Sequence, residues 1–219
     1  MRFVEGMKEV DGEESRGAGV QVSGVVLAGG RSRRLGVDKA LLRLGGRLLI
    51  ERVVDSLREL SDDILVVTNA PERFADVLEN VRYVPDALPY SAALVGVYSG
   101  LRAARHKYAL VVACDMPFLN VRLLRYLVSR AVDCDVVIPR HPQGLETLHA
   151  VYSKACLTPM ERQLQVDELV IVDFFQQVRV CYVEQAQLAA FDPEGRSFVN
   201  INTPVDLELA LRIEEAQEG

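Results

Sequence analysis

The residues best suited to chemistry lie together near the N-terminus, where positions 24–39 read Gly-Val-Val-Leu-Ala-Gly-Gly-Arg-Ser-Arg-Arg-Leu-Gly-Val-Asp-Lys. An apolar run leads into the pair Gly29 and Gly30. Glycine adopts positive φ readily and lets the main chain approach a ligand, so such a pair suits a concave anion site made of backbone N–H groups. Basic side chains follow directly: Arg31, Arg33, Arg34 and Lys39. Together these features predict a binding site for a polyphosphate.

The alternative for this stretch is an ordinary turn, since glycine pairs commonly mark turns. The density of positive charge, with Asp38 as the single acidic residue, favours the phosphate site. The stretch matches neither Gly-x-x-x-x-Gly-Lys-Ser/Thr nor Gly-x-Gly-x-x-Gly, so it indicates a different nucleotide fold. At most one or two of the three arginines can face a ligand, and spacing alone does not choose among them.

Composition limits the class of protein. The 219 residues are 49% hydrophobic, enough for a full core in a single domain. A net charge of −6 provides no general attraction to nucleic acid or to an anionic membrane. No apolar run approaches the ~20 residues that cross a bilayer, and the N-terminus lacks the order of a secretory signal. We therefore predict a cytoplasmic protein without nucleic-acid or membrane partners.

Apolar runs alternate with helical patterns along most of the chain. Strands are predicted at 25–27, 64–67, 81–84, 109–113, 136–138 and 178–183, and helical periodicity covers 48–60, 94–104 and 121–128. This alternation predicts an α/β fold, a single-domain, doubly wound, mostly parallel sheet. Residues 1–22, rich in Gly, Glu and Lys, are assigned to a flexible N-terminal arm, and residues 23–216 to the folded domain.

Ligands of such sheets bind beyond the carboxyl ends of the strands. The segments that follow the predicted strands should therefore converge on one site: Gly29-Gly30, Thr68-Asn69, Pro85-Asp86 and Cys114-Asp115-Met116-Pro117.

Asp115, at the tip of an apolar strand, suits Mg²⁺, which binds through one or two carboxylates, water and phosphates. The alternative is an Asp that caps the helix near Asn120; opposite the basic loop, the metal role is favoured. Lys39 is predicted to contact phosphate rather than solvent. Asn200 and Asn202 lie on one side of an extended segment, where amides serve either a ligand or a helix cap.

The cysteines and histidines form no metal pattern. Cys114, Cys134, Cys156 and Cys181 are scattered, which predicts buried free thiols. His106 and His141 are assigned to the surface, and a packing role is favoured for His149.

The C-terminal helix is the best delimited. Thr203 is its predicted N-cap, Pro204 occupies the first position, and Asp206 completes a capping-box-like pattern. One apolar face is expected to pack on the sheet edge. Further upstream, residues 173–177 are expected to form a helix that either packs on the protein or contacts a partner, and packing is favoured.

These residues together resemble the molybdenum cofactor guanylyltransferases, nucleotidyltransferases with a glycosyltransferase-A-like fold. The resemblance covers residues 24–211 and rests on an ordered set of motifs: 27–39, Thr68-Asn69, Pro85-Asp86, 114–117, Glu146-Thr-Leu-His-Ala-Val-Tyr152 and Asn200-Ile-Asn-Thr-Pro-Val-Asp-Leu207. It implies a Rossmann-like nucleotide-diphospho-sugar transferase fold. It also implies transfer of GMP from GTP to molybdenum-bound molybdopterin, with release of pyrophosphate.

The resemblance also implies roles for individual residues. The triphosphate would be held by Leu27, Ala28, Gly29, Gly30 and Lys39. Asn69 and Asp86 would contact guanosine, Asp115 would carry Mg²⁺, and Asn200 and Asn202 would lie near the acceptor or metal. Arg34 matches the loop arginine of the family, so Arg34, Lys39 and Asp115 are the implied catalytic residues. GTP, a molybdopterin acceptor and molybdoenzyme or cofactor-delivery proteins are the implied partners.

The chain departs from the family pattern at several positions. Leu35 replaces a common Met, Thr147 stands where Pro often follows the Glu, and Ala92-Ala93-Leu94-Val95-Gly96 stands where Gly-Pro-Leu-x-Gly is frequent. The alternatives are a cytidylyltransferase for the same cofactor, another nucleotidyltransferase with a phosphorylated acceptor, and a nucleotide sensor without catalysis. The first group more often carries Ala-Ala-Gly at the first turn, so Ala28-Gly29-Gly30 favours guanine.

Overall fold

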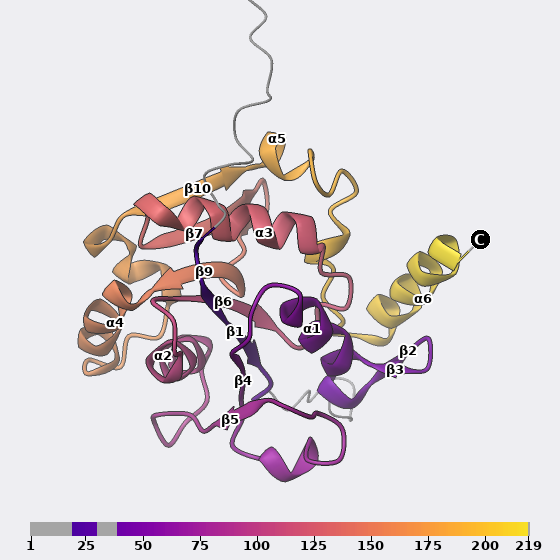
Figure 1. Cartoon of the computed structure of the whole chain (residues 1–219), viewed down its shortest axis with the longest axis horizontal. Helices are drawn as coiled ribbons and strands as arrows, with labels where there is room; N and C mark the ends of the chain where they lie inside the picture. Colours follow the sequence, from indigo (N-terminus) through magenta and orange to yellow (C-terminus); the bar gives the residue numbers. More distant parts are fainter. Residues whose placement is uncertain (1–18, 30–38, 219) are drawn as a thin grey trace, which may run out of the picture.

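The central element of the fold is a mixed sheet. The computed structural model describes residues 19–29 and 39–218, and within them the chain forms one eight-stranded sheet and a two-stranded hairpin (Figure 1). The strands lie in the order β10 (Val180–Glu184), β7 (Val136–His141), β9 (His149–Ser153), β6 (Tyr108–Ala113), β1 (Val22–Leu27), β4 (Ile64–Val67) and β5 (Arg82–Val84), with β8 (Gly144–Leu145) paired to β7. The pairs that include β8 or β9 are antiparallel and the others are parallel. The predicted α/β fold with a mostly parallel sheet is confirmed.

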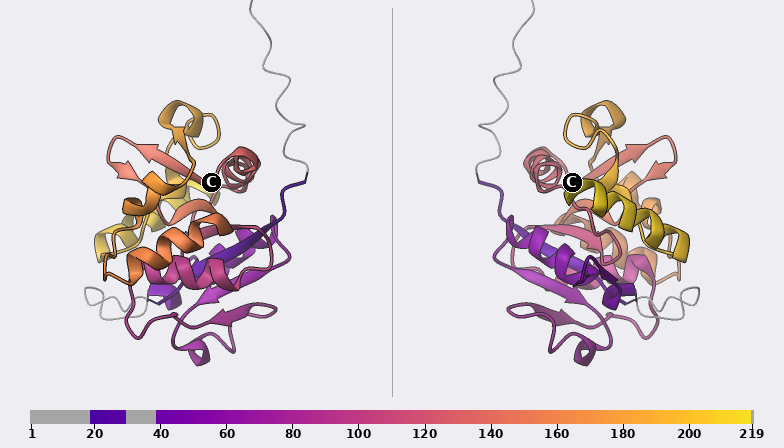
Figure 2. Two further views of the ribbon diagram at one scale, coloured as in Figure 1. Left: turned by 90° about the vertical axis from the view of Figure 1, so that its left-hand side faces the viewer. Right: turned by 90° about the vertical axis from the view of Figure 1, so that its right-hand side faces the viewer.

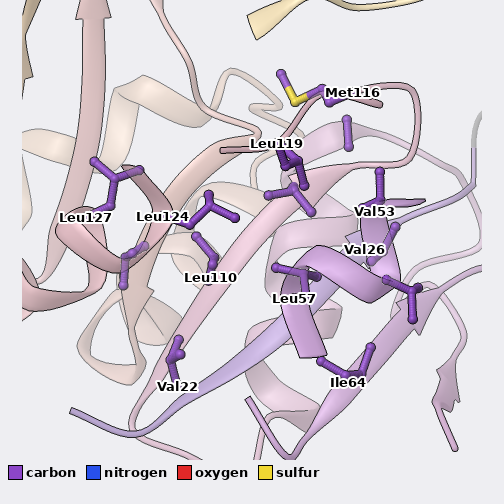
Figure 3. Close-up of a cluster of buried hydrophobic side chains, with 14 of the residues drawn as sticks. Val22, Val26, Val53, Leu57, Ile64, Leu110, Met116, Leu119, Leu124 and Leu127 are labelled. Carbon is purple, nitrogen blue, oxygen red and sulfur yellow. The ribbon is translucent and has the colours of Figure 1, made fainter. Parts of the chain in front are cut away.

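Helices cover both faces of this sheet. On one face, α1 (Leu49–Arg58) and α3 (Val121–Ser129) enclose an apolar cluster with β1, β4 and β6, shown in Figure 3. On the other face, α2 (Ala93–Ala103) and α4 (Leu157–Leu164) enclose a second cluster. The remaining helical segments are α5 (Gln185–Leu188), α6 (Pro204–Glu218) and the 3-10 turns η1 (Lys39–Leu41), η2 (Pro71–Arg73), η3 (Arg130–Asp133), η4 (Lys154–Cys156), η5 (Ile171–Gln177) and η6 (Arg196–Phe198).

The central strand β1 shows why the sequence folds in this way. Val26 belongs to the first cluster and Val25 to the second, as alternation along a strand with two covered faces requires. α2 lies close to β1 and β4 because Gly100 has no side chain: a Cβ there would collide with Val25 and lie 3.2 Å from a methyl of Val67. Close packing of α2 therefore depends on a glycine.

The predicted strands are all present; β4 has its predicted bounds, and the other strands have shifted ends. β1 begins at Val22, a residue that the sequence assigned to the N-terminal arm, and residues 1–18 lie outside the described part. β9, β8 and the hairpin of β2 (Arg43–Leu44) and β3 (Arg47–Leu48) were not predicted. β9 was missed because His149 and Ser153 stand at its two ends, which leaves a short apolar run between them.

The helix α6 is capped as predicted but packs elsewhere. Thr203 N donates to Asp206 Oδ2 (2.8 Å) and Asp206 N to Thr203 Oγ1 (3.3 Å). The expected position on the edge of the main sheet is wrong: Ala210 is buried with Leu44 and Leu49, beside the hairpin (Figure 1 and the right-hand view of Figure 2). The Arg52–Glu214 ion pair fixes α6 to α1.

Two of the four cysteines form a disulfide, contrary to the prediction of free thiols. Cys134 and Cys181 are bonded, with 5.9 Å between their Cα atoms, whereas Cys114 and Cys156 are free as expected. The pairing arises because β10 lies beside β7 and brings Cys181 close to Cys134, which lies two residues before β7. A spacing of 47 residues does not reveal that adjacency.

Other predictions concern packing and membranes. Residues 173–177 lie in the 3-10 turn η5, in which Phe174 and Phe175 are buried, so the predicted packing role is confirmed. His106 and His141 are partly exposed. No helix in the described part of the chain is long and apolar enough to cross a membrane.

Candidate active site

A cavity of about 740 Å³ opens at the carboxyl ends of the central strands. Leu27, Val67 and Ala113, the last residues of β1, β4 and β6, form its floor. This is where ligands bind in open parallel sheets. Its walls include Gly29, Lys39, Asp86, Ser91, Cys114, Asp115, Glu146, Asn200 and Asn202. The predicted convergence is therefore observed for Gly29, Asp86 and residues 114–116, whereas Thr68 and Asn69 do not line the cavity.

The charged centre of the cavity consists of Lys39, Asp115 and Asn202. Lys39, the first residue of η1, places its Nζ 3.0 Å from Asp115 Oδ2 and also donates to Asn202 Oδ1. The side chains of Lys39 and Asp115 are only 19% and 14% exposed. Ile201, which is fully buried, donates its N–H to the Asp115 carbonyl and so holds the two loops together.

The capping alternative for Asp115 is wrong. Asn120 itself caps α3, because its Oδ1 accepts from Arg122 N (2.9 Å) and Leu123 N (3.1 Å). The Asp115 carboxylate instead faces the Lys39 ammonium in the cavity.

The oxygen atoms around Lys39 fit a magnesium site. A carboxylate of Asp115 and an amide oxygen of Asn202 share one cation, and oxygen donors of this kind are those that Mg²⁺ prefers. Among residues 19–29 and 39–218, no group of three His, Cys, Asp or Glu side chains could hold a metal ion. Phosphate oxygens and water would therefore complete the shell.

A second polar group lies around Asp86. Its Oδ2 accepts from Asn69 Nδ2 (2.9 Å) and from Ser91 Oγ (2.7 Å), and its N–H donates to Asn69 Oδ1 (2.9 Å). Asp86 and Ser91 line the cavity, whereas both ends of the Asn69 amide bond to Asp86. Sequence reasoning missed Ser91, since a single serine in a loop carries no signal.

The glycine loop is described only in part. Gly29 lines the cavity, and its φ lies outside the positive range. Beside it, Ala28 is buried and its N–H donates to Val67 O (3.0 Å), so this N–H is engaged in the sheet. Gly30, Arg31, Arg33, Arg34 and Leu35 lie outside the described residues.

The opposite wall comes from the turn between β8 and β9. Glu146 lies there, and burial raises the pKa of its carboxyl group. Cys114 also reaches the cavity, and burial raises the pKa of its thiol to about 12, so it is not a nucleophile at neutral pH. Asn200 lines the cavity and donates to Phe198 O (3.2 Å).

His149 lies behind this wall. It is fully buried in β9, its ring lies 4.8 Å from that of Phe198, and neither ring nitrogen has a partner in the described part of the chain. Burial lowers the pKa of His149 to about 4. The predicted packing role is confirmed.

Comparison with known proteins identifies the family. The model of the MobA-like NTP transferase domain matches residues 24–179. The chain belongs to this family. The match includes β1 from Gly24 onward, the Gly29-Gly30 pair and the strand tips that carry Asn69, Asp86 and Asp115.

Relatives of this MobA-like NTP transferase span nearly the same length. A probable molybdenum cofactor guanylyltransferase of Pelotomaculum thermopropionicum is 40% identical over 188 residues, 86% of this chain and 91% of the relative. A molybdenum cofactor guanylyltransferase of Desulfosudis oleivorans is 39% identical over 191 residues, 86% of this chain and 94% of the relative. The resemblance noted in the sequence is thereby confirmed.

Solved structures of other proteins superpose on this chain over most of its length. The molybdopterin-guanine dinucleotide biosynthesis protein A of Archaeoglobus fulgidus superposes with a TM-score of 0.79 at 28% identity, covering 89% of this chain and all of that one. The fold is shared by a 2-C-methyl-D-erythritol 4-phosphate cytidylyltransferase of Thermus thermophilus. That structure superposes with a TM-score of 0.68 at 20% identity, covering 90% of this chain and all of that one. The MobA-like chain is therefore a nucleotidyltransferase in sequence and in fold.

Proposed function

We propose that this nucleotidyltransferase transfers GMP from GTP to molybdenum-bound molybdopterin, giving the guanine dinucleotide cofactor and pyrophosphate. The names of the relatives support this substrate pair. The observation that carries the proposal is a single cavity with Lys39, Asp115 and Asn202 at its centre and Asp86 on its wall. The side chains at the centre would bind the triphosphate, and Asp86 on the wall would bind the base.

The reaction requires little acid–base chemistry. An oxygen of the acceptor's terminal phosphate, already anionic at neutral pH, forms a bond to the α-phosphorus of GTP, and the bond from that phosphorus to the bridging oxygen breaks. Pyrophosphate leaves with the electron pair. Catalysis therefore rests on alignment and on charge neutralisation, and we assign no general base.

The residues of the cavity would divide this work. Lys39 and Arg34 would stabilise negative charge on the departing pyrophosphate. Asp115 and Asn202 would hold Mg²⁺, which when bound supplies further neutralisation of phosphate oxygens. Asn200 is placed by the same proposal near the acceptor.

Base recognition is assigned to the Asp86 side of the cavity. Gly29 adds no side chain there: a Cβ at this position would lie 3.8 Å from Asp86 Oδ2. We propose that this space receives guanine, with Asn69 contributing through Asp86. The cytoplasm is the proposed compartment, in accord with the net charge of −6 and the expected absence of membrane and nucleic-acid partners.

The test compares thermal stabilisation by Mg²⁺ with each nucleoside triphosphate, followed by pyrophosphate release with a molybdopterin acceptor. GTP should stabilise the protein most and support turnover. A larger shift with CTP would overturn the guanine assignment, and binding without turnover would point to a nucleotide sensor.

The variant Asp115→Ala tests the assigned metal role. It should lose transfer while keeping the melting temperature of the parent protein within a few degrees, because the side chain lies in a cavity rather than in the core. Retained Mg²⁺-dependent transfer would remove Asp115 from that role.

A further inference from the structure

The orientation of the Asp86 carboxylate is set by contacts to one of its two oxygens. Oδ2 accepts from Asn69 Nδ2 and from Ser91 Oγ, at 2.9 and 2.7 Å. Among the described residues, Oδ1 has no hydrogen-bond partner. A charge-assisted bond from each side therefore fixes one oxygen and leaves the other as an acceptor in the cavity wall.

The backbone beneath Asp86 is held separately. Asp86 N donates to Asn69 Oδ1 (2.9 Å), and the next residue, Ala87, donates its N–H to Ser99 Oγ (2.8 Å). Ser99 is buried in α2 and donates in turn to Val95 O. Loss of the Ser91 hydroxyl would therefore leave the loop in place and leave the carboxylate held by Asn69 Nδ2 alone.

We infer that Ser91 is a specificity-determining positioning residue, which orients Asp86 so that its free oxygen accepts from the ring edge of the bound base. The inference rests on the proposed function and extends it to a residue outside the family motifs quoted above. Ser91 directly precedes Ala92-Ala93, where this chain departs from the common Gly-Pro.

The geometry selects among bases by hydrogen-bond polarity. Guanine presents a ring N–H beside an exocyclic amino group, both donors suited to a carboxylate, whereas the corresponding ring nitrogens of cytosine and adenine are acceptors. Hypoxanthine keeps the ring N–H but lacks the amino group. An Asp86 carboxylate held by both Asn69 and Ser91 should therefore distinguish GTP from ITP, and one held by Asn69 alone should distinguish them less.

The experiment measures kcat and KM for GTP and for ITP in Ser91→Ala, Ser91→Thr and Ser129→Ala. Ser129 bonds to Tyr126 O at the end of α3, outside the cavity lining, and is the matched control. Ser91→Ala should raise KM for GTP about three- to tenfold, the usual effect of one lost hydrogen bond, and KM for ITP less. Ser91→Thr, which keeps a hydroxyl, should restore the preference, and kcat at saturation should change little.

The outcomes separate this inference from the proposed function. If the parent protein prefers GTP but Ser91→Ala raises KM for GTP and for ITP equally, or changes neither KM, the orienting role of Ser91 is wrong. The proposed function then still stands. If the parent protein prefers CTP, or fails to turn over GTP, the proposed function fails and this inference falls with it. An unchanged melting temperature of Ser91→Ala confirms that the fold is intact.

Discussion

The Lys39 ammonium lies 3.0 Å from the Asp115 carboxylate, although 76 residues separate the two in sequence. In this state the protein's own cation neutralises the oxygens that we assign to Mg²⁺. A triphosphate would offer Lys39 stronger partners and release Asp115. The metal should therefore bind well only together with the nucleotide.

Replacement of Lys39 by Met tests this competition. Without nucleotide, Lys39→Met should bind Mn²⁺ about three- to tenfold more tightly than the parent protein, because a partly buried ion pair no longer opposes the metal. Transfer should nevertheless fall at least ~100-fold, since charge on pyrophosphate is no longer stabilised. Electron paramagnetic resonance of free Mn²⁺ measures binding. Arg43→Met, at an exposed residue of the hairpin, is the control, and unchanged Mn²⁺ affinity in Lys39→Met would contradict the idea.

The substitution Gly29→Ala should alter nucleotide choice without altering stability. In the free protein the added methyl group would lie 3.8 Å from Asp86 Oδ2, an ordinary contact. In the complex it would take space beside the base, at a cost comparable to one misplaced methylene, about tenfold in affinity. Calorimetric titration with GTP and CTP should show GTP weakened more than CTP. Equal binding of GTP by both proteins would remove Gly29 from base selection.

The substitution Gly100→Ala should destabilise the fold. The new Cβ would collide with Val25 in the central strand, and overpacking of this kind costs about 1–3 kcal/mol. Urea unfolding followed by circular dichroism measures the loss. Gly29→Ala without nucleotide is the matched control, and equal stability of the two variants would show that α2 can move away from β1.

His149 should make stability depend on pH. Burial lowers its pKa to about 4, against about 6.5 in an unfolded chain, with Asp192 opposing and His141 reinforcing the shift. The unfolded chain binds the extra proton, so this contribution is present above pH 6.5 and is lost as pH falls toward 4, by at most about 3 kcal/mol. His149→Met should remove this part of the pH dependence in urea unfolding between pH 7.5 and 4.5. His106→Gln is the control, and parallel curves for parent and His149→Met would contradict the assignment.

The Cys134–Cys181 disulfide should be detectable by counting thiols. After denaturation without reductant, the four-cysteine chain should expose two reactive thiols, those of Cys114 and Cys156, and four after reduction. Reduction should also lower the free energy of unfolding by about 2–4 kcal/mol. Because cytosolic proteins seldom keep disulfides, alkylation during cell lysis also tests the proposed compartment. Four thiols without reductant would show that the bond is absent in the purified protein.

Much of the site could be predicted because strand tips are visible in the sequence. Asp86 and Asp115 each follow an apolar run, and tips of parallel strands meet at one edge of a sheet. Ser91 and the position of α6 could not be predicted in this way. They depend on how loops of no regular period fold back, and no local pattern encodes that.

The sequence by itself determined the chemistry available to this protein: a glycine loop with basic residues, carboxylates at strand ends and a capped final helix, because these depend on residue type and short-range spacing. Only the tertiary structure decided which of them meet. Lys39 contacts Asn202 across 163 residues, Cys134 bonds to Cys181, and Ser91 orients Asp86. Such contacts follow from the order and register of strands, which long-range packing selects.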